Sequence, residues 1–206
     1  MISQRGAAQG IAPFFASDPG ANDQIVKIIG SVEQKGLPTD PILTKVRQGL
    51  TLHAQPTVIV AAAQKLASRL EIARDALAPH PTMLDIVAGQ DALLFGASPA
   101  ELRAVRAASA NQSLLVPLGV LSQLVVSGVN AKRAAEIVVN LMRRGVSPDQ
   151  LATLGNDVDS DVHHGAQALS ALDIRTRGLN AVLAPPGAAA AADASGFTSG
   201  SIPKKP

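Results

Sequence analysis

Cysteine, tryptophan and tyrosine are all absent from this 206-residue chain, and phenylalanine occurs only four times. Without cysteine there can be no disulfide scaffold, no thiolate zinc site and no cysteine nucleophile. The scarcity of aromatic side chains also excludes a platform on which nucleic-acid bases could stack. Phe14 and Phe15 lie near the N-terminus and Phe197 lies in the C-terminal segment, so Phe95 is the aromatic residue expected in the core.

The chain also has little excess charge of either sign. The 18 Lys and Arg residues are nearly balanced by 16 Asp and Glu residues, which leaves a formal net charge of +2. The isoelectric point is nevertheless about 9.2, because without Cys and Tyr little titrates between histidine and lysine. A charge so close to neutral lacks the electrostatic footprint of a nucleic-acid-binding protein, so we expect no nucleic-acid partner.

No apolar run is long enough to span a membrane. The longest uncharged segment lies between Arg106 and Lys132, and its apolar part extends from Leu114 to Val129. Pro117 and several polar residues interrupt this part, which falls short of the ~18 apolar residues that a spanning helix needs. The segment therefore predicts a buried central helix and no transmembrane segment.

The first residues do not have the pattern of an export signal. Residues 1–20 contain one basic residue, Arg5, and their short apolar stretch is broken by Pro13. We expect a periplasmic or secreted protein if an upstream signal has been removed, and otherwise a cytoplasmic one.

Both ends of the chain are of low complexity. Residues 1–21 are rich in Gly, Ala, Pro and Ser, and residues 184–206 repeat the same few residue types. Such segments cannot bury enough apolar surface to offset the entropy cost of ordering them. We expect a flexible N-terminal segment at 1–21, a helical domain at 22–183 and a disordered tail at 184–206.

The dominant period of the middle part is helical. Ile25, Ile28, Ile29 and Val32 recur at i, i+3, i+4 and i+7, which places one apolar stripe on a helix. No stretch alternates apolar and polar residues as a half-buried strand would. The pattern predicts an all-α fold. Further stripes comprise Leu43, Val46 and Leu50; Val58, Ile59, Ala62, Leu66, Leu70, Ala73 and Leu77; Leu118, Leu121 and Val125; and Ala134, Ile137, Val138, Leu141 and Met142.

The connections between these segments share one pattern: a glycine, an apolar residue and then a capping residue, often followed by proline. Glycine permits the left-handed conformation after a helix, and the apolar residue packs back on the last turn. Ser98 with Glu101, and Ser147 with Gln150, are expected to form capping boxes. The four junctions with this pattern begin at Gly36, Gly96, Gly128 and Gly145.

Short connections make consecutive helices antiparallel neighbours. A faint repeat, seen in the 17 residues from Gly128 to Gly145, favours stacked antiparallel helical hairpins of a solenoid. The spacing is irregular elsewhere, so a compact multi-helix bundle stays an alternative. Arg175 and Arg177 precede Gly178 and are expected at the negative end of a helix.

Two long runs carry a resemblance. They are GLPTDPILTKVRQGLTLHAQPTVIVAAAQKLASRLEIARDAL and SLLVPLGVLSQLVVSGVNAKRAAEIVVNLMRRGVSPDQL. Together they resemble a family of uncharacterised, all-helical bacterial proteins that often carry export signals. The resemblance implies a location at the cell envelope, and it implies no reaction and no functional residue.

One constellation could hold a metal ion. The Asp-x-Asp-x-Asp run from Asp157 to Asp161 begins like a calcium loop, but Val162 stands where Gly is required and Ala168 where Glu is required. On a helix, Asp157, Asp161 and His164 share one face at i, i+4 and i+7, a spacing that suits a divalent metal. The alternative interpretation, which we favour, is a solvated polar face, with no metal ligand among these residues.

The remaining candidates are weaker. A set of basic residues could converge on a phosphate, but they are more simply outer faces and last turns of helices. No motif for a serine nucleophile is present, and His53 and His80 lie at predicted helix junctions. We therefore predict no catalytic or cofactor-binding residue and no cofactor. The basic set consists of Arg103, Arg106, Lys132, Arg133, Arg143 and Arg144.

The sequence favours a non-enzymatic structural or protein-interaction module, which would bind an as yet unknown protein partner through a groove or face formed by successive helices. One alternative is a metal- or small-ligand-dependent protein that uses Asp157, Asp161 and His164. A weaker alternative is a nucleic-acid accessory protein. The oligomeric state is left open.

Overall fold

The computed structural model describes residues 14–15, 18–109 and 112–183, and within these ranges the chain forms nine α-helices and no strand. The all-α prediction is confirmed. The helices are α1 (Pro19–Gln34), α2 (Asp40–Thr51), α3 (Pro56–Ala76), α4 (Met83–Leu94), α5 (Pro99–Ala108), α6 (Leu115–Val126), α7 (Ala131–Arg143), α8 (Pro148–His163) and α9 (Ala168–Leu183).

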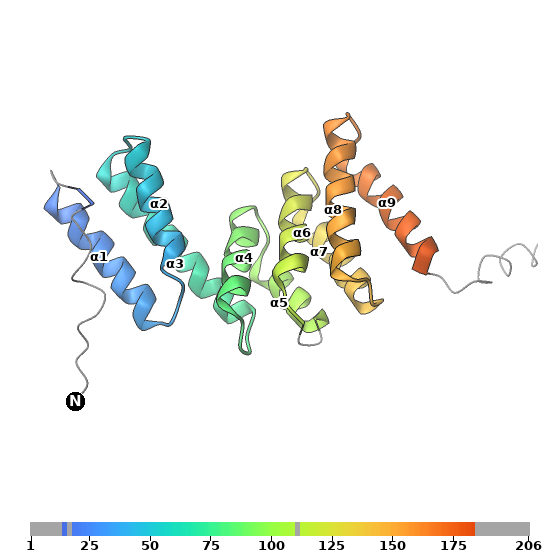
Figure 1. Ribbon diagram of the computed structural model, residues 1–206, viewed down its shortest axis with the longest axis horizontal. Helices are drawn as coiled ribbons and strands as arrows, with labels where there is room; N and C mark the ends of the chain where they lie inside the picture. Colours follow the sequence, from blue (N-terminus) through green and yellow to red (C-terminus); the bar gives the residue numbers. More distant parts are fainter. Residues whose placement is uncertain (1–13, 16–17, 110–111, 184–206) are drawn as a thin grey trace, which may run out of the picture.

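The helices form a linear stack of two layers (Figure 1). In one layer α1, α3, α5 and α7 pack each against the next, and in the other α4 packs on α6 and α6 on α8. Every closely packed pair joins helices that are adjacent or one apart in the chain. This is the neighbour-only packing of stacked helical hairpins and of solenoids. The described residues therefore form an elongated stack instead of a compact bundle.

The helix junctions follow the pattern that the sequence predicts. Gly36, Gly96, Gly128 and Gly145 all have positive φ, as does Gly165 at a fifth junction. After each, the next residue donates its backbone N–H to a carbonyl five residues earlier, as Leu37 does to Val32 at 3.0 Å. These bonds close each helix and turn the chain back within a few residues, which is why neighbouring helices stack.

Capping side chains fix where helices begin. The predicted capping boxes of Ser98 with Glu101 and of Ser147 with Gln150 are both present. Thr82 and Asp85 form a third box at the start of α4, which the sequence does not predict because Asp replaces the usual Glu or Gln.

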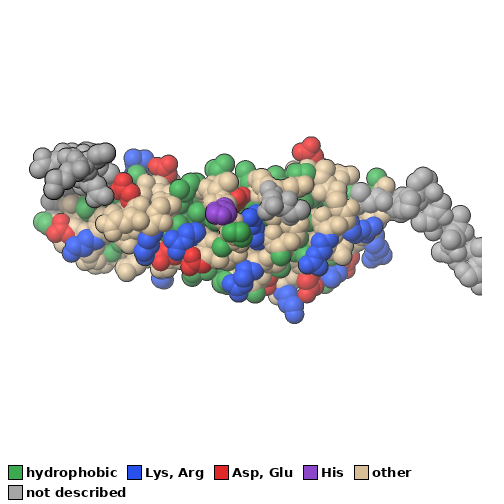
Figure 2. Space-filling view, turned by 90° about the horizontal axis from the view of Figure 1, so that it is seen from below, with side chains coloured by type: hydrophobic (Ala, Val, Ile, Leu, Met, Phe, Trp, Pro, Cys, Tyr) green, Lys and Arg blue, Asp and Glu red, His purple; other side chains and the backbone are tan. Residues whose placement is uncertain are grey.

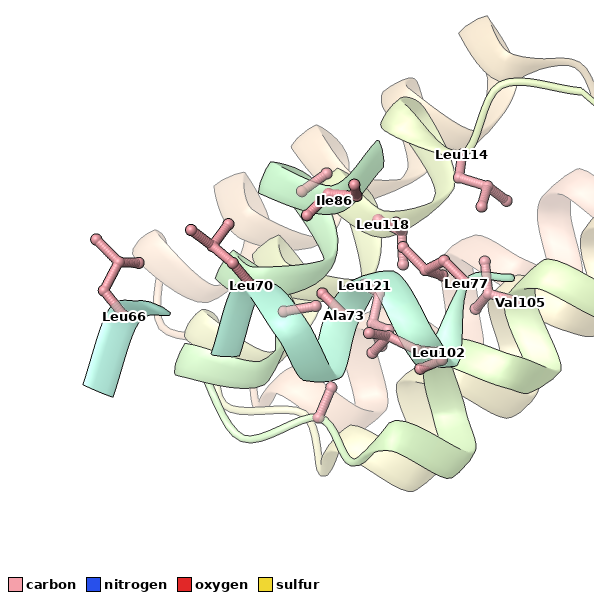
Figure 3. Close-up of a cluster of buried hydrophobic side chains, with 14 of the residues drawn as sticks. Leu66, Leu70, Ala73, Leu77, Ile86, Leu102, Val105, Leu114, Leu118 and Leu121 are labelled. Carbon is pink, nitrogen blue, oxygen red and sulfur yellow. The ribbon is translucent and has the colours of Figure 1, made fainter. Parts of the chain in front are cut away.

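The core runs along the whole stack between the two layers. Figure 3 shows its middle part, where Leu77 of α3 lies beside Leu102 of α5 and Leu118 and Leu121 of α6, with Leu70 two turns earlier on α3. All five side chains are fully buried. Because α6 contributes Leu118, Leu121 and Leu124 to this core, the prediction of a buried central helix is confirmed.

The prediction that Phe95 is the aromatic residue of the core was wrong. Phe95 follows the last turn of α4 and is 45% exposed, whereas Phe15 is only 6% exposed and belongs to the core. The backbone N–H of Phe14 donates to Asn22 Oδ1 at 2.9 Å, which holds this short segment against α1. α1 itself begins at Pro19, earlier than the predicted domain start at residue 22, because the Asp18 carboxylate caps it.

Three predictions concern the C-terminal part of the chain, the helix end near Gly178 and membrane-spanning segments. α9 ends at Leu183, and the predicted disordered tail at 184–206 lies outside the described residues, as do residues 1–13 of the N-terminal segment. Gly178 lies inside α9, so the expectation that Arg175 and Arg177 mark a helix end was wrong. No helix in the described ranges is long and apolar enough to cross a membrane.

Candidate functional site

The two carboxylates of the candidate metal-binding face, Asp157 and Asp161, form ion pairs with an arginine. Arg175 of α9 donates through Nε and Nη2 to the two carboxylate oxygens of Asp161, at 2.7 Å each. Its Nη1 also donates to Asp157 Oδ2 at 3.2 Å. His164 points its Nδ1 at the Ser160 carbonyl oxygen, 2.7 Å away. The structure thus brings Asp157 and Asp161 together around a guanidinium, and the residue that joins them was missed from the sequence.

This ion pair changes the titration of its members. The hydrogen bonds and the positive charge of Arg175 lower the pKa of Asp161 below its ordinary value, against a smaller opposing effect of burial. The same contact raises the pKa of Arg175. Within the described part of the chain, no group of three or more His, Asp or Glu residues is placed to hold a metal ion. The geometry therefore gives the metal hypothesis no support.

The same ion pair borders an open groove between the last two helices, which we name the α8–α9 groove. It has a volume of about 570 Å³. Three aspartates line one side and apolar residues of α9 line the other. The groove is lined by Asp149, Gln150, Thr153, Leu154, Asp157 and Asp161 of α8 and by Ile174, Arg175, Gly178, Leu179 and Val182 of α9.

A second and larger groove, which we name the α2–α4 groove, lies near the other end of the stack. It has a volume of about 700 Å³, with α3 as its floor and α2 and α4 as its walls. Figure 1 shows α2 and α4 in front of the long α3 and separated from each other along it. The groove is lined by Pro38, Asp40, Pro41, Thr44, Lys45 and Gln48; by Ala62, Lys65, Leu66 and Arg69; and by Met83, Leu84, Val87, Gln90, Asp91 and Leu94.

The two walls of the α2–α4 groove differ in chemistry. The α4 wall presents exposed Met83, Leu84 and Leu94. The α2 wall is mainly polar, and there Lys45 Nζ donates to Gln48 Oε1 at 3.2 Å. An amphipathic segment would match this arrangement, with its apolar side against α4 and the floor and its polar side against α2.

A chain of polar side chains joins the floor of the α2–α4 groove to its α4 wall. Arg69 Nε donates to Oε1 of Gln90 at 3.2 Å, and Gln90 Nε2 donates to Asp91 Oδ1 at 2.6 Å. Gln90 is buried. These bonds satisfy the buried amide and fix the direction of the Arg69 side chain.

The candidate basic residues are dispersed, and three of the six are bonded to other parts of the chain. Arg106 donates to the Pro79 carbonyl at 2.8 Å, Arg133 pairs with Asp173 at 3.2 Å, and Arg144 donates to Asn180. These bonds tie helices to their neighbours. Figure 2 shows acidic and basic side chains intermingled on the face it presents, without a field of one sign.

The two junction histidines have a backbone role. His53 and His80 both have positive φ, at 52° and 54°. His53 occupies the place that glycine takes at the other junctions, and the following Ala54 N–H donates to the Gly49 carbonyl at 3.0 Å. The prediction that both lie at helix junctions is confirmed.

Comparisons with known protein families, with curated proteins and with solved structures found no match to this chain. The resemblance to exported helical proteins of bacteria therefore stays a prediction.

Proposed function

We propose that this protein is a non-enzymatic interaction module that takes an amphipathic helix of a partner protein in the α2–α4 groove. The observation that carries the proposal is the interruption of one helix layer. In that layer α6 packs on both α4 and α8, but α2, which precedes α4 along α3, does not pack closely on α4. The partner helix would lie on α3 between α2 and α4.

The apolar surface of the groove supports a helix as the occupant. Met83, Leu84, Val87 and Leu94 recur along α4 at nearly helical spacing and all line the groove. Leu84 alone is 63% exposed. Apolar surface left in a concave site of this kind marks an interaction surface more often than chance exposure does.

The charges of the groove indicate which helix it prefers. Lys45, Lys65 and Arg69 line it together with only two acidic residues, Asp40 and Asp91. Neither Lys45 nor Lys65 forms an ion pair within the described ranges. An amphipathic helix with acidic residues along one flank would pair with these lysines and bury its apolar stripe against α4.

A displayed library of helical peptides tests the proposal. We expect the full chain to select peptides with an apolar stripe and an acidic flank. Leu84→Glu should weaken their binding by about tenfold or more, which corresponds to ~1.4 kcal/mol, because it puts a charge on the apolar wall.

Val126→Glu is the matched control. Val126 is 62% exposed at the end of α6 and does not line the groove, so the same change there should leave binding unchanged. Circular dichroism would confirm that both variants fold. Selection of no such peptide, or equal binding by Leu84→Glu and Val126→Glu, would overturn the proposed function.

A further inference from the structure

We propose that the α8–α9 groove is a second docking site, independent of the first, and that it takes a basic amphipathic helix of a partner protein. The inference rests on the packing of α8, on the apolar side chains of α9 and on the charge of the groove.

The packing of α8 leaves one side available. α6 packs on α4 and α8 packs on α6, while α9 packs on α8 without closing the groove between them. α8 is the last member of this layer in the described part of the chain (Figure 1). Its Asp149 and Thr153 line the groove, and so does Asp157, which also pairs with Arg175 of α9. A helix placed there would continue the layer.

The apolar side of the groove is unusually exposed. Ile174 is 61% exposed and Val182 is 76% exposed, and both line the groove. They lie four residues on either side of Gly178, so the three form one stripe along α9. A Cβ added at Gly178 would meet no atom within 4 Å, which shows open space above the middle of the stripe. A second helix can approach α9 closely at this point.

The charge of the groove selects a basic occupant. Asp149, Asp157 and Asp161 line it with one cation, Arg175, which leaves a net charge of −2. Arg175 already pairs with Asp157 and Asp161. Asp149 forms no ion pair within the described residues and lies at the groove end where α9 terminates. Lysine or arginine on the incoming helix would pair with it, and its apolar stripe would cover Ile174 and Val182.

The test is a peptide selection that isolates this groove. A displayed library of helical peptides is selected on the full chain and depleted on the Gly178→Leu variant, whose side chain fills the open space. We expect peptides with an apolar stripe and Lys or Arg on one flank. Fluorescence anisotropy should show binding that falls by about tenfold or more in Gly178→Leu and in Asp149→Lys. Raising the salt concentration should weaken it as well.

Two control variants keep the result specific. Gly119→Leu places the same side chain on α6, where an added Cβ also meets nothing within 4 Å, and Gly119 does not line either groove. It should bind like the wild type. Leu84→Glu should also leave these peptides bound, so failure of the first docking site would not be mistaken for failure of this one.

Three outcomes would overturn the proposal. The first is selection of no peptide, or only of acidic peptides, on the wild type. The second is a dimer in light scattering that Gly178→Leu abolishes, which would assign the groove to a second copy. The third is a zero-length amine–carboxylate crosslink from Lys204 or Lys205 to Asp149 or Asp157 within one chain, which would assign it to the chain's own C-terminal segment.

Discussion

Two glycines inside helices meet opposite surroundings, which predicts opposite effects of the same substitution. A Cβ on Gly89 of α4 would lie 2.8 Å from Leu77 Cδ1 and 3.2 Å from Ala73 Cβ, whereas one on Gly119 of α6 would meet nothing within 4 Å. Gly119→Ala should stabilise the protein by about 0.5–1 kcal/mol through helix propensity. Gly89→Ala should destabilise it by about 1 kcal/mol or more, because overpacking exceeds that gain.

Urea unfolding of the two variants beside the wild type measures both effects. Stabilisation by Gly89→Ala would show that α3 and α4 can move apart at no cost. It would contradict the close approach of these helices on which the floor of the α2–α4 groove depends.

A single buried carboxylate joins the starts of two helices. Asp85 Oδ2 accepts hydrogen bonds from the N–H and hydroxyl of Thr82, at 3.0 and 2.8 Å. Its Oδ1 accepts the backbone N–H of Leu114, which precedes α6, at 3.0 Å. Because all of these donors lose their partner at once, Asp85→Ala should destabilise the protein by about 2–4 kcal/mol.

Glu101→Ala is the comparison for Asp85→Ala. Glu101 closes a capping box only within its own helix, so its loss should cost about 1 kcal/mol. The free energy of unfolding from urea titrations compares the two variants. Equal losses would mean that the bond from Asp85 to Leu114 contributes nothing to stability.

At the scale of the helices, the ion pair between α8 and α9 predicts a pH dependence. The pKa of Asp161 is lower in the folded protein than in the unfolded chain, so its ionised form stabilises the fold. This contribution is complete above the ordinary pKa of an aspartate, about 3.9, and is lost as the pH falls through the lowered value. Arg175→Met removes it at every pH.

The midpoint of urea unfolding should therefore differ between wild type and Arg175→Met most at neutral pH, and the difference should shrink below about pH 4. Arg177→Met is the control, because Arg177 is exposed two residues away and forms no ion pair within the described residues. A difference that stays constant from pH 7 to about pH 3 would show that Arg175 acts through packing of its aliphatic stem instead.

The junctions and the ion pair also show what a sequence can and cannot predict here. Gly36 and Gly145 were identified because a helix end is set by a few adjacent residues. Arg175 was assigned to a helix end, since its true partner, Asp161, lies 14 residues away on another helix. Phe95 was placed in the core on residue type alone, and whether a side chain is buried depends on how helices stack.

The grooves, like the Arg175 ion pair, depend on how the helices stack and were not predicted from the sequence. The sequence predicts a surface made by successive helices, but not that α2 and α4 would be held apart along α3. That separation follows from the packing of α1, α2, α4 and α5 along α3, which no local pattern encodes.

At the scale of the whole molecule, neighbour-only packing predicts that stability is distributed along the stack. In such an arrangement each helix pair contributes its own stability and its interfaces, and the ends open more easily than the middle. Leu121 lies in the middle, in α6, and Leu172 lies at the end, in α9; both are fully buried. Truncating each leucine to alanine should therefore destabilise several helices at Leu121 but only the end of the stack at Leu172.

Leu121→Ala should cost about 2–5 kcal/mol, as large-to-small changes in a packed core do, and should lower hydrogen-exchange protection in α4, α6, α7 and α8 together. Those are α6 itself and the three helices that pack most closely on it. Leu172→Ala should lower protection in α9 and leave α4 unchanged. α9 lies at the end of the described stack, and α8 is the helix on which it packs closely. Hydrogen exchange resolved by peptide distinguishes the two patterns. If Leu172→Ala lowered protection equally from α1 to α9, the molecule would unfold as one cooperative unit, and stability would not be distributed along the stack.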